Sequence, residues 1–411
     1  MSFLTKLICL FLAISFSFRM HSAIAFGVCL SIGVILICFE KRLILVNWFK
    51  HLPENNLLIP IIFFLSTFTI SCLISVNQLR SFSVLLYLCL FIVFSFIIFQ
   101  NFKTNPKELL LLSNFLFISI CFCVLFVLFF NILTGEIFKI IQGKKKLVEM
   151  IRFKGFVNIL TILVLLLPLL EKKIGHKNSY LSTLPIIFII PIIITSNCNS
   201  AILGIFAGAF FVISFKILVS LKIKQNKILS LFLLTTILVS ILTNNFSENH
   251  KRNKIEDYKF LISTNFVDAH RQIIWGFSLN KFKENLIFGI GPDTSNFIEG
   301  SQEQIGHELT GTMHFIPSHP HNFLIELLLE TGLMGTASFI LLIFFINYNI
   351  FKIVNKKKFS YIIFFNGYFW GASLVNFSFW NAWWQVSYFF ILAIISSILY
   401  AENLEKSQDV K

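Results

Sequence analysis

Histidine is concentrated in one polar stretch of this 411-residue chain. His319 and His321 stand in the segment Pro317–Asn322, directly before an apolar run that begins at Phe323. Imidazole changes its charge near neutral pH, so either ring could act as a general base. A helix start here would also present backbone N–H groups that favour an anion. The segment predicts proton-transfer chemistry, although a loop histidine that caps a helix fits the same pattern.

Three side chains around the histidines are candidates for supporting roles. Asn322 follows the histidines directly, and Glu326 lies four residues further on, where its carboxylate could orient an imidazole ring. Trp275 lies upstream, in a stretch typical of an amphipathic interfacial helix. We therefore expect residues from two separate segments to build one site.

A metal site is an alternative interpretation of the same histidines. His307 or His314 could complete a ligand set with His319 and His321, because neutral imidazole is a common metal ligand. The spacing matches no recognised zinc motif, so we expect no metal and no other cofactor.

Arginine is rare in this chain, with six among 34 basic residues, so its positions are informative. Arg271 precedes Trp275 by one helical turn, and Arg152 opens an apolar run together with Lys154. A guanidinium binds phosphate through two parallel hydrogen bonds and does not lose its proton. We expect Arg271, Arg152 and Lys154 to bind a phosphate or diphosphate; the simpler interpretation is snorkelling to a membrane interface.

The composition of the chain is that of a membrane protein. Hydrophobic residues make up 56% of it and charged residues 13%, against about 25% charged in an ordinary soluble protein. These figures exclude a soluble enzyme, a disordered protein and a nucleic-acid binder. A membrane span needs about 20 apolar residues. The pattern predicts an all-α polytopic membrane protein with about twelve transmembrane helices, at residues 4–18, 22–39, 56–76, 81–99, 109–133, 156–170, 181–197, 200–220, 228–243, 323–350, 360–379 and 385–401.

The basic residues predict how these helices are oriented. If the N-terminus is cytoplasmic, the inner segments hold nineteen Lys and Arg residues, whereas the short outer loops hold only Arg19 and Arg80. Because cytoplasmic loops are enriched in Lys and Arg, we expect both termini in the cytoplasm. The chain then divides into nine helices in 1–243, an outer loop with short helices at 244–322, three helices in 323–401 and a cytoplasmic tail at 402–411.

Aromatic residues cluster in the segment 377–384, which contains Trp380, Trp383 and Trp384 and lies at a predicted outer helix end. Such a cluster is typical of an interfacial aromatic belt. A wall of a lipid- or sugar-binding cleft is the alternative. Nearby, Gly332 and Gly335 are expected to allow close packing between helices.

The order of these motifs resembles that of a known family. The motifs, in chain order, are Arg152-x-x-Gly, Arg271-x-x-x-Trp, Phe288-Gly-Ile-Gly-Pro, His319-x-His-Asn-x-x-x-Glu and Glu330-x-Gly-x-x-Gly. Together they resemble the O-antigen ligase and polymerase family of bacterial membrane glycosyltransferases. The resemblance is most specific over residues 268–335, and the helix layout extends it to most of the chain.

The resemblance implies transfer of a preassembled glycan from undecaprenyl diphosphate to a lipid A–core sugar, at the periplasmic face of the bacterial inner membrane. It implies a fold like that of other C-superfamily glycosyltransferases and an inverting reaction without a metal. His321 would be the general base, with His319 as support or substitute, and Arg271 and Arg152 would hold the diphosphate. An O-antigen polymerase or a protein O-oligosaccharyltransferase would use the same chemistry. A polysaccharide transporter or flippase is the alternative from a different class, but it would place polar residues in mid-span.

One position departs from the family pattern. Many members carry an arginine at the outer end of the helix corresponding to 200–220, where this chain has Asn199. One diphosphate contact is therefore missing, or a lysine of 144–146 replaces it. A ligase is favoured over a polymerase, because only one sizeable outer loop is predicted and polymerases of this family often have two.

Overall fold

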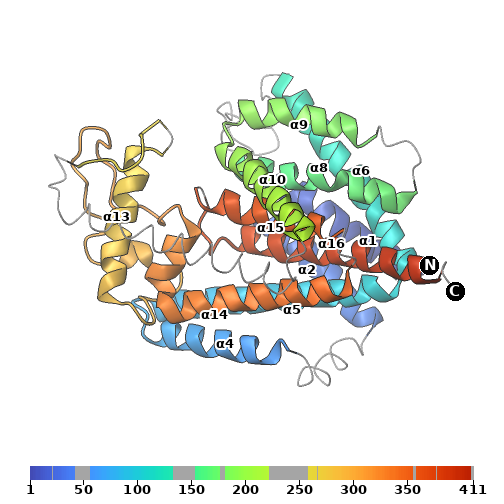
Figure 1. The fold of residues 1–411 in the computed structure, drawn as a ribbon, viewed down its shortest axis with the longest axis horizontal. Helices are drawn as coiled ribbons and strands as arrows, with labels where there is room; N and C mark the ends of the chain where they lie inside the picture. The colour runs from blue at the N-terminus through green and yellow to red at the C-terminus, as the bar shows by residue number, and fades with distance from the viewer. Residues whose placement is uncertain are drawn as a thin grey trace.

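The regular elements in the part of the chain that the structure describes are helices, and most of 285–322 is turns and loop. The computed structural model describes residues 1–20, 22–41, 56–132, 153–175, 181–221, 258–265, 267–354, 358–375 and 377–408. The helices in these ranges are α1 (Phe3–Arg19), α2 (Ala23–Glu40), α4 (Leu58–Leu73), α5 (Gln78–Thr104), α6 (Pro106–Ile132), α8 (Lys154–Ile174), α9 (Thr183–Thr195), α10 (Asn199–Ser220), α13 (Ala269–Glu284), the 3₁₀ helix η3 (Ser295–Phe297), α14 (Phe323–Ile353), α15 (Ser360–Ser373) and α16 (Ala382–Gln408). The all-α architecture is confirmed (Figure 1).

Most of the expected membrane segments are helices. Eleven of the twelve apolar runs fall on helices, and the run at 228–243 lies outside the described residues. Among the described helices, α2, α5, α6, α8, α10, α14 and α16 are long and apolar enough to cross a membrane. The last helix, α16, continues to Gln408, so residues 402–408 prolong it instead of forming a separate tail. The chain is a polytopic membrane protein.

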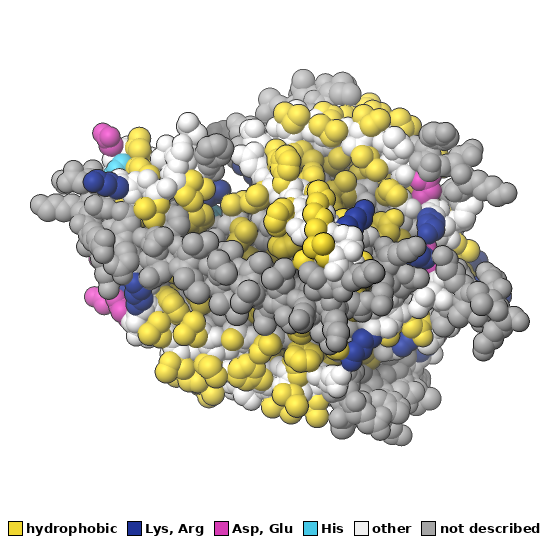
Figure 2. All heavy atoms as spheres, viewed as in Figure 1, with side chains coloured by type: hydrophobic (Ala, Val, Ile, Leu, Met, Phe, Trp, Pro, Cys, Tyr) yellow, Lys and Arg dark blue, Asp and Glu magenta, His cyan; other side chains and the backbone are white. Residues whose placement is uncertain are grey.

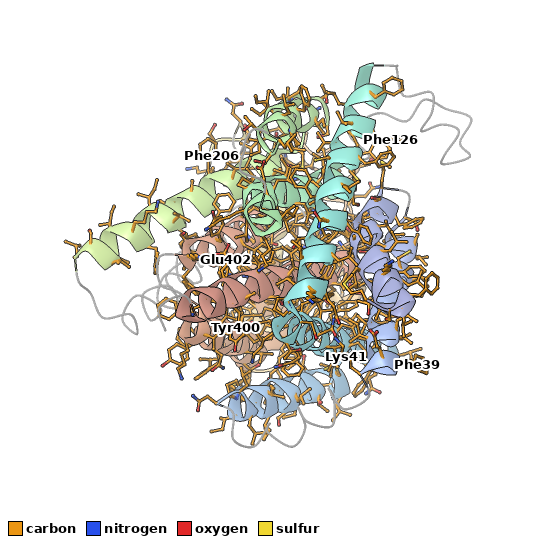
Figure 3. The ribbon with its side chains drawn as sticks, turned by 90° about the vertical axis from the view of Figure 1, so that its right-hand side faces the viewer. Phe39, Lys41, Phe126, Phe206, Tyr400 and Glu402 are labelled. Atoms are coloured by element: carbon orange, nitrogen blue, oxygen red, sulfur yellow. The ribbon has the colours of Figure 1, made fainter. Side chains whose placement is uncertain are left out.

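The bundle exposes an apolar surface. The helices α16 and α8 are mostly buried, whereas α5 and α10 turn most of their side chains outward. Apolar side chains cover the described surface over α4, α9 and α10 (Figure 2). Large exposed apolar residues such as Phe39 and Phe206 are labelled in Figure 3. A surface of this kind suits lipid contact, because lipid tails do not penalise exposed apolar side chains.

Both chain termini lie at the end of the bundle opposite α13 (Figure 1), and three of the ion pairs belong to this end. Lys41 binds Glu108 at 2.9 Å, and Lys172 and Lys358 both bind Glu402. Figure 3 views the molecule from this end. These three lysines belong to the segments predicted to be cytoplasmic, so the structure gathers predicted inner charges at one end. Which side of the membrane this end faces stays a prediction.

The polar segment before α14 has a hydrophobic core of its own, which we call the loop core. The loop core consists of Tyr258, Ile273, Ile274, Trp275, Phe277, Leu279, Ile290, Ile298, Ile305, Phe315, Ile316, Ile325 and Leu329. Helix α13 supplies five of these side chains and packs against α14. The segment is therefore an ordered unit built around α13 and η3, as the predicted short helices require.

Helix α14 is broken at Gly332, which has φ 65° and ψ −170°. A break inside a membrane helix exposes backbone groups that need new partners. The freed N–H groups of Leu333 and Met334 donate to the carbonyls of Leu286 (2.8 Å) and Ile287 (3.1 Å). The loop thus replaces the hydrogen bonds that the helix loses.

The carbonyls on the other side of the break are also satisfied. The Leu329 carbonyl accepts from the Ile290 N–H at 3.2 Å, and the Glu330 carbonyl accepts from the Gly291 N–H at 2.8 Å and the Ser71 hydroxyl at 3.0 Å. The loop and the broken helix approach each other closely at Gly289 and Gly332, and both positions require glycine. A Cβ on Gly289 would lie 2.4 Å from the carbonyl carbon of Glu330.

The first part of α14, residues 323–331, is a half-helix shared by two cores. Its side chains toward the loop core are Ile325 and Leu329, and those toward the bundle core are Leu324, Leu327 and Leu328. Residues three and four apart share one face of a helix, so these two sets form two apolar stripes. The half-helix therefore fixes the loop unit to the membrane bundle.

The Gly332→Ala variant should unfold at a lower temperature than the native chain. A Cβ at this position would lie 2.3 Å from the Ile287 carbonyl oxygen, and overpacking of this kind costs about 1–3 kcal/mol. Thermal unfolding of the purified protein in detergent measures the effect. Gly311→Ala is the matched control, because Gly311 has a similar φ of 57° and nothing within 4 Å of an added Cβ. Equal unfolding temperatures for the two variants would contradict this account of the break.

Candidate functional site

The two candidate histidines lie side by side, with tilted rings, at the start of α14. The ring centroids of His319 and His321 are 4.1 Å apart, with 55° between the ring planes. His321 has φ 57°, which is uncommon for a residue other than glycine and costs about 1–3 kcal/mol. The Ser318 hydroxyl lies 2.9 Å from Nδ1 of His319. The structure thus brings both predicted rings together in a constrained turn.

Asn322 confirms that a helix begins directly after the histidines. It is the N-cap of α14, and its Oδ1 accepts from the N–H groups of Leu324 (3.1 Å) and Ile325 (3.2 Å). The Glu326 N–H donates to the Asn322 carbonyl at 2.9 Å. These N–H groups are therefore already bonded. The start of α14 has fewer free N–H groups for an anion than the sequence predicts.

Trp275 holds the turn that carries His319 and His321 through a hydrogen bond to its backbone. Its indole Nε1 donates to the Pro320 carbonyl at 3.0 Å, and this carbonyl lies between the two histidines in the chain. Trp275 is buried in the loop core. A buried hydrogen bond of this kind fixes the backbone that carries His319 and His321.

Arg271 lies one turn before Trp275 on α13, so the two side chains share one face of that helix. The Arg271 Nε lies 3.3 Å from Oδ2 of Asp268, the N-cap of α13. The Asp268 carboxylate is half exposed, and an exposed pair of this kind contributes at most about 1 kcal/mol. An anionic ligand could therefore compete with Asp268 for the guanidinium.

Glu326 is buried, and its carboxylate meets the turn before α16. One oxygen accepts from the Ser378 hydroxyl and the other from the Phe379 N–H, both at 2.6 Å. Glu326 thus joins the half-helix to this turn. Orientation of an imidazole by Glu326 stays a prediction.

Glu330, one turn further on, joins the half-helix to two other segments. Its carboxylate accepts from the N–H groups of Asp293 (2.6 Å), Thr294 (3.1 Å) and Ser295 (2.8 Å). It also accepts from the indole N–H of Trp380. A buried carboxylate needs such donors, because an unbonded one would be very costly.

Arg80 reaches the same loop from α5. Its Nε donates to Oδ2 of Asp293 at 2.7 Å, and its guanidinium lies over the ring of Phe297 at 5.2 Å. From the sequence alone, Arg80 is only one of two basic residues in the short outer loops. Its rarity as an arginine was the signal, but its partner 213 positions away could not be read from the sequence.

The aromatic cluster at 377–384 is only partly a membrane belt. Trp380 and Trp384 are buried inside the protein, and the Trp384 indole donates to the Ser373 hydroxyl at 2.8 Å. The belt interpretation is therefore wrong for these two residues, because their polar N–H groups have internal acceptors. Trp383 differs, since the Arg19 guanidinium lies over its ring at 4.1 Å.

The predicted diphosphate-binding residues of α8 are described in part. Arg152 lies outside the described residues, and Lys154 is the first residue of α8. The Lys154 carbonyl accepts from Sγ of Cys198 at 3.4 Å, so the first turn of α8 touches the residue before Asn199. The structure therefore places Lys154 and Asn199 at neighbouring helix starts.

The other loop histidines are engaged in structure. His307 is buried and accepts from the Leu309 N–H through Nδ1, and His314 Nδ1 lies 2.5 Å from the Gln302 carbonyl. The His270 Nε2 lies 2.9 Å from the His314 carbonyl. Within the described ranges, no three His, Cys, Asp or Glu side chains gather as a metal site would require.

Comparison with known proteins concerns the part of the chain that contains this site. Residues 184–340 match a protein family described as O-antigen ligase. This range includes Arg271, Trp275, both candidate histidines and the half-helix. Arg152 and Lys154 precede it.

Several rickettsial proteins, provisionally named polysaccharide ligases, are similar to this chain. The Rickettsia typhi protein is 32% identical over 133 residues, which is 32% of this chain and 32% of the relative. The Rickettsia prowazekii protein is 27% identical over 229 residues, 55% of this chain and 53% of the relative. A Rickettsia conorii protein is 31% identical over 133 residues. The matches thus span about a third to a half of the relatives' length. The segment 184–340, which carries the paired histidines, is thus similar to the O-antigen ligase family.

Proposed function

We propose that this protein is a membrane glycosyltransferase of the O-antigen ligase type. It would move a preassembled glycan from undecaprenyl diphosphate to a sugar of the lipid A–core, on the periplasmic side of the bacterial inner membrane. The observation that carries the proposal is the His319–His321 pair, held at the start of α14 by the Asn322 cap and by Trp275, within the family match. The φ of 57° at His321 supports the proposal, because backbone strain of this kind clusters at active sites.

The proposed reaction needs a base on one side of the anomeric carbon and positive charge on the other. His321, with His319 as its support or substitute, takes the proton from the acceptor hydroxyl. The hydroxyl oxygen attacks the anomeric carbon, and the bond from that carbon to the diphosphate oxygen breaks. The electron pair leaves with the undecaprenyl diphosphate, and the anomeric configuration inverts.

Arg271 is suited to supply the positive charge that stabilises the leaving diphosphate. It lies on the helix face that also supports the histidine turn, and its only carboxylate partner within the described residues is the exposed Asp268. Arg152 and Lys154 would assist from the start of α8. None of these roles requires a metal ion.

An O-antigen polymerase or a protein O-oligosaccharyltransferase would use the same residues with a different acceptor. The names of the rickettsial relatives favour a polysaccharide ligase. A transporter is less well supported, because the candidate residues gather in the loop unit and at helix starts, not in mid-span.

Replacement of the proposed base or of the diphosphate ligand should abolish most glycan transfer. We expect His321→Ala to lower the rate by about 10²–10⁴-fold, the usual contribution of a general base. Arg271→Lys keeps the charge but loses the bidentate geometry, so a fall of about 10²-fold is expected. The assay is transfer of carrier-linked glycan to lipid A–core in membranes with equal amounts of each variant. Lys281→Gln is the control, since Lys281 lies on α13 and also pairs with a carboxylate three residues away. Full activity of both His321→Ala and Arg271→Lys would contradict the proposed mechanism.

Trp275→Phe should slow transfer by about tenfold and change its pH profile. The substitution keeps the aromatic ring but leaves the Pro320 carbonyl without its donor, at a cost of about 1–3 kcal/mol. The histidine turn then loses its fixed geometry. Rates are measured across pH 5–9 on folded protein. If the rate and the profile both match the native chain, Trp275 does not position the turn.

Deletion of the gene distinguishes a ligase from a polymerase. Without a ligase, polymerised glycan should remain on the carrier lipid and disappear from lipid A–core. Without a polymerase, single repeat units would still reach the core. Electrophoresis of lipopolysaccharide together with extraction of carrier-linked glycan separates the two patterns. An unchanged pattern in both fractions would contradict the proposed function.

A further inference from the structure

Arg19 ends α1, and its guanidinium is packed inside a contact between three helices. The guanidinium carbon lies 4.1 Å from the centre of the Trp383 ring, at the start of α16. A Cβ added to Gly155, in the first turn of α8, would lie 2.8 Å from Arg19 Nη2 and 3.2 Å from the Trp383 ring. A side chain at position 155 would therefore displace the guanidinium or the Trp383 ring from this place.

This guanidinium lacks an anionic partner in the part of the chain that the structure describes. Its Nε is buried and has no hydrogen-bond acceptor there. No carboxylate of the described residues forms an ion pair with it, whereas Arg80 pairs with Asp293 and Arg271 with Asp268. Arg19 as a whole is only partly buried, but its Nε is closed to water, and a buried polar group without a partner is costly, so a site of this kind favours an anionic ligand.

The neighbours of Arg19 add to this positive site. Lys154 begins α8 immediately before Gly155, and Phe153 at the N-cap has no side chain that could bond the first N–H groups. A helix start carries a partial positive charge, and the α8 start lies directly against the guanidinium. On its other side this turn touches Cys198, next to Asn199. Arg19 thus supplies a guanidinium close to the helix start where an arginine was expected and Asn199 stands.

Two simpler roles account for only part of this geometry. A basic residue in the last turn of a helix stabilises the helix dipole, and an arginine at a helix end can snorkel toward lipid headgroups. Both roles place the cation in water or among headgroups. Neither explains why its Nε is buried without an acceptor among the described residues.

We propose that Arg19 binds the diphosphate of the lipid carrier, with its guanidinium held by Trp383 and Gly155 and with Lys154 beside it. The proposal rests on the proposed function for the identity of the ligand. An aromatic face restrains the planar guanidinium without using its N–H groups, so these remain available for phosphate oxygens. Arg19 is then a donor-binding residue on the bundle side of the site.

A binding experiment with a short carrier analogue tests this assignment. Farnesyl diphosphate is titrated by calorimetry into the full chain in phosphatidylcholine nanodiscs. Loss of a charge-assisted hydrogen-bond pair should weaken binding by about 10–100-fold in Arg19→Gln. Gly155→Ala leaves every charge unchanged but displaces the guanidinium, so it should also weaken binding. Arg80→Gln is the matched control, because Arg80 is already paired with Asp293, and its affinity should stay within twofold of native.

Each outcome decides the proposal. Equal affinity of the native chain, Arg19→Gln and Gly155→Ala would overturn it, as would no binding of farnesyl diphosphate to the native chain. A further outcome is that Arg19→Gln leaves the affinity for farnesyl diphosphate unchanged and lowers only the unfolding temperature of the protein in phosphatidylglycerol nanodiscs. In that case Arg19 binds bulk lipid headgroups and the proposal fails. Thermal unfolding of each variant verifies that it is folded, and Arg19→Lys, which keeps the charge, replaces Arg19→Gln if that variant does not fold. The proposed function fails separately, by full glycan transfer in His321→Ala, even where Arg19 still binds the diphosphate.

Discussion

The buried carboxylate of Glu330 joins the parts of the molecule on which the candidate site depends. It lies on the half-helix 323–331, and it accepts from three successive backbone N–H groups of the loop and from the Trp380 indole. One turn earlier, Glu326 accepts from Ser378 and Phe379. Carboxylates at this depth are unfavourable unless donors surround them. The loop and the turn before α16 must therefore stay in place for the half-helix to keep both carboxyl groups buried.

The break at Gly332 makes this arrangement compatible with a membrane helix. The loop segment 286–291 supplies acceptors and donors to the backbone on both sides of the break. Its close approach depends on the absence of side chains at Gly289 and Gly332. The two glycine motifs that were read separately from the sequence, at 288–292 and 330–335, are thus two halves of one contact.

Local patterns predicted much of this architecture. Apolar run length gave eleven of the twelve expected segments as helices, and the helix start after the histidines was also predicted, although the sequence pointed to a histidine and not to Asn322 as its cap. The close pair of His319 and His321 also follows from their spacing. What could not be predicted depends on partners far apart in the chain. The contacts of Glu326 with Ser378, of Arg80 with Asp293 and of Arg19 with Trp383 each join residues more than 50 positions apart. For the same reason the burial of Trp380 and Trp384 could not be separated from a lipid-facing belt by composition alone.

Because the half-helix is shared by two cores, it determines which acceptor hydroxyls the histidine turn could reach. Because its opposite stripes are buried in the bundle and in the loop core, the histidine turn cannot rise or sink relative to the membrane helices. If His321 is the base, as proposed, its height relative to the membrane helices is fixed. The base would reach only acceptor hydroxyls presented at that height, and it would not sense how many sugars extend beyond the reacting bond. Selection would then depend on the distance of a hydroxyl from the membrane, and the length of the transferred glycan would be left to other proteins.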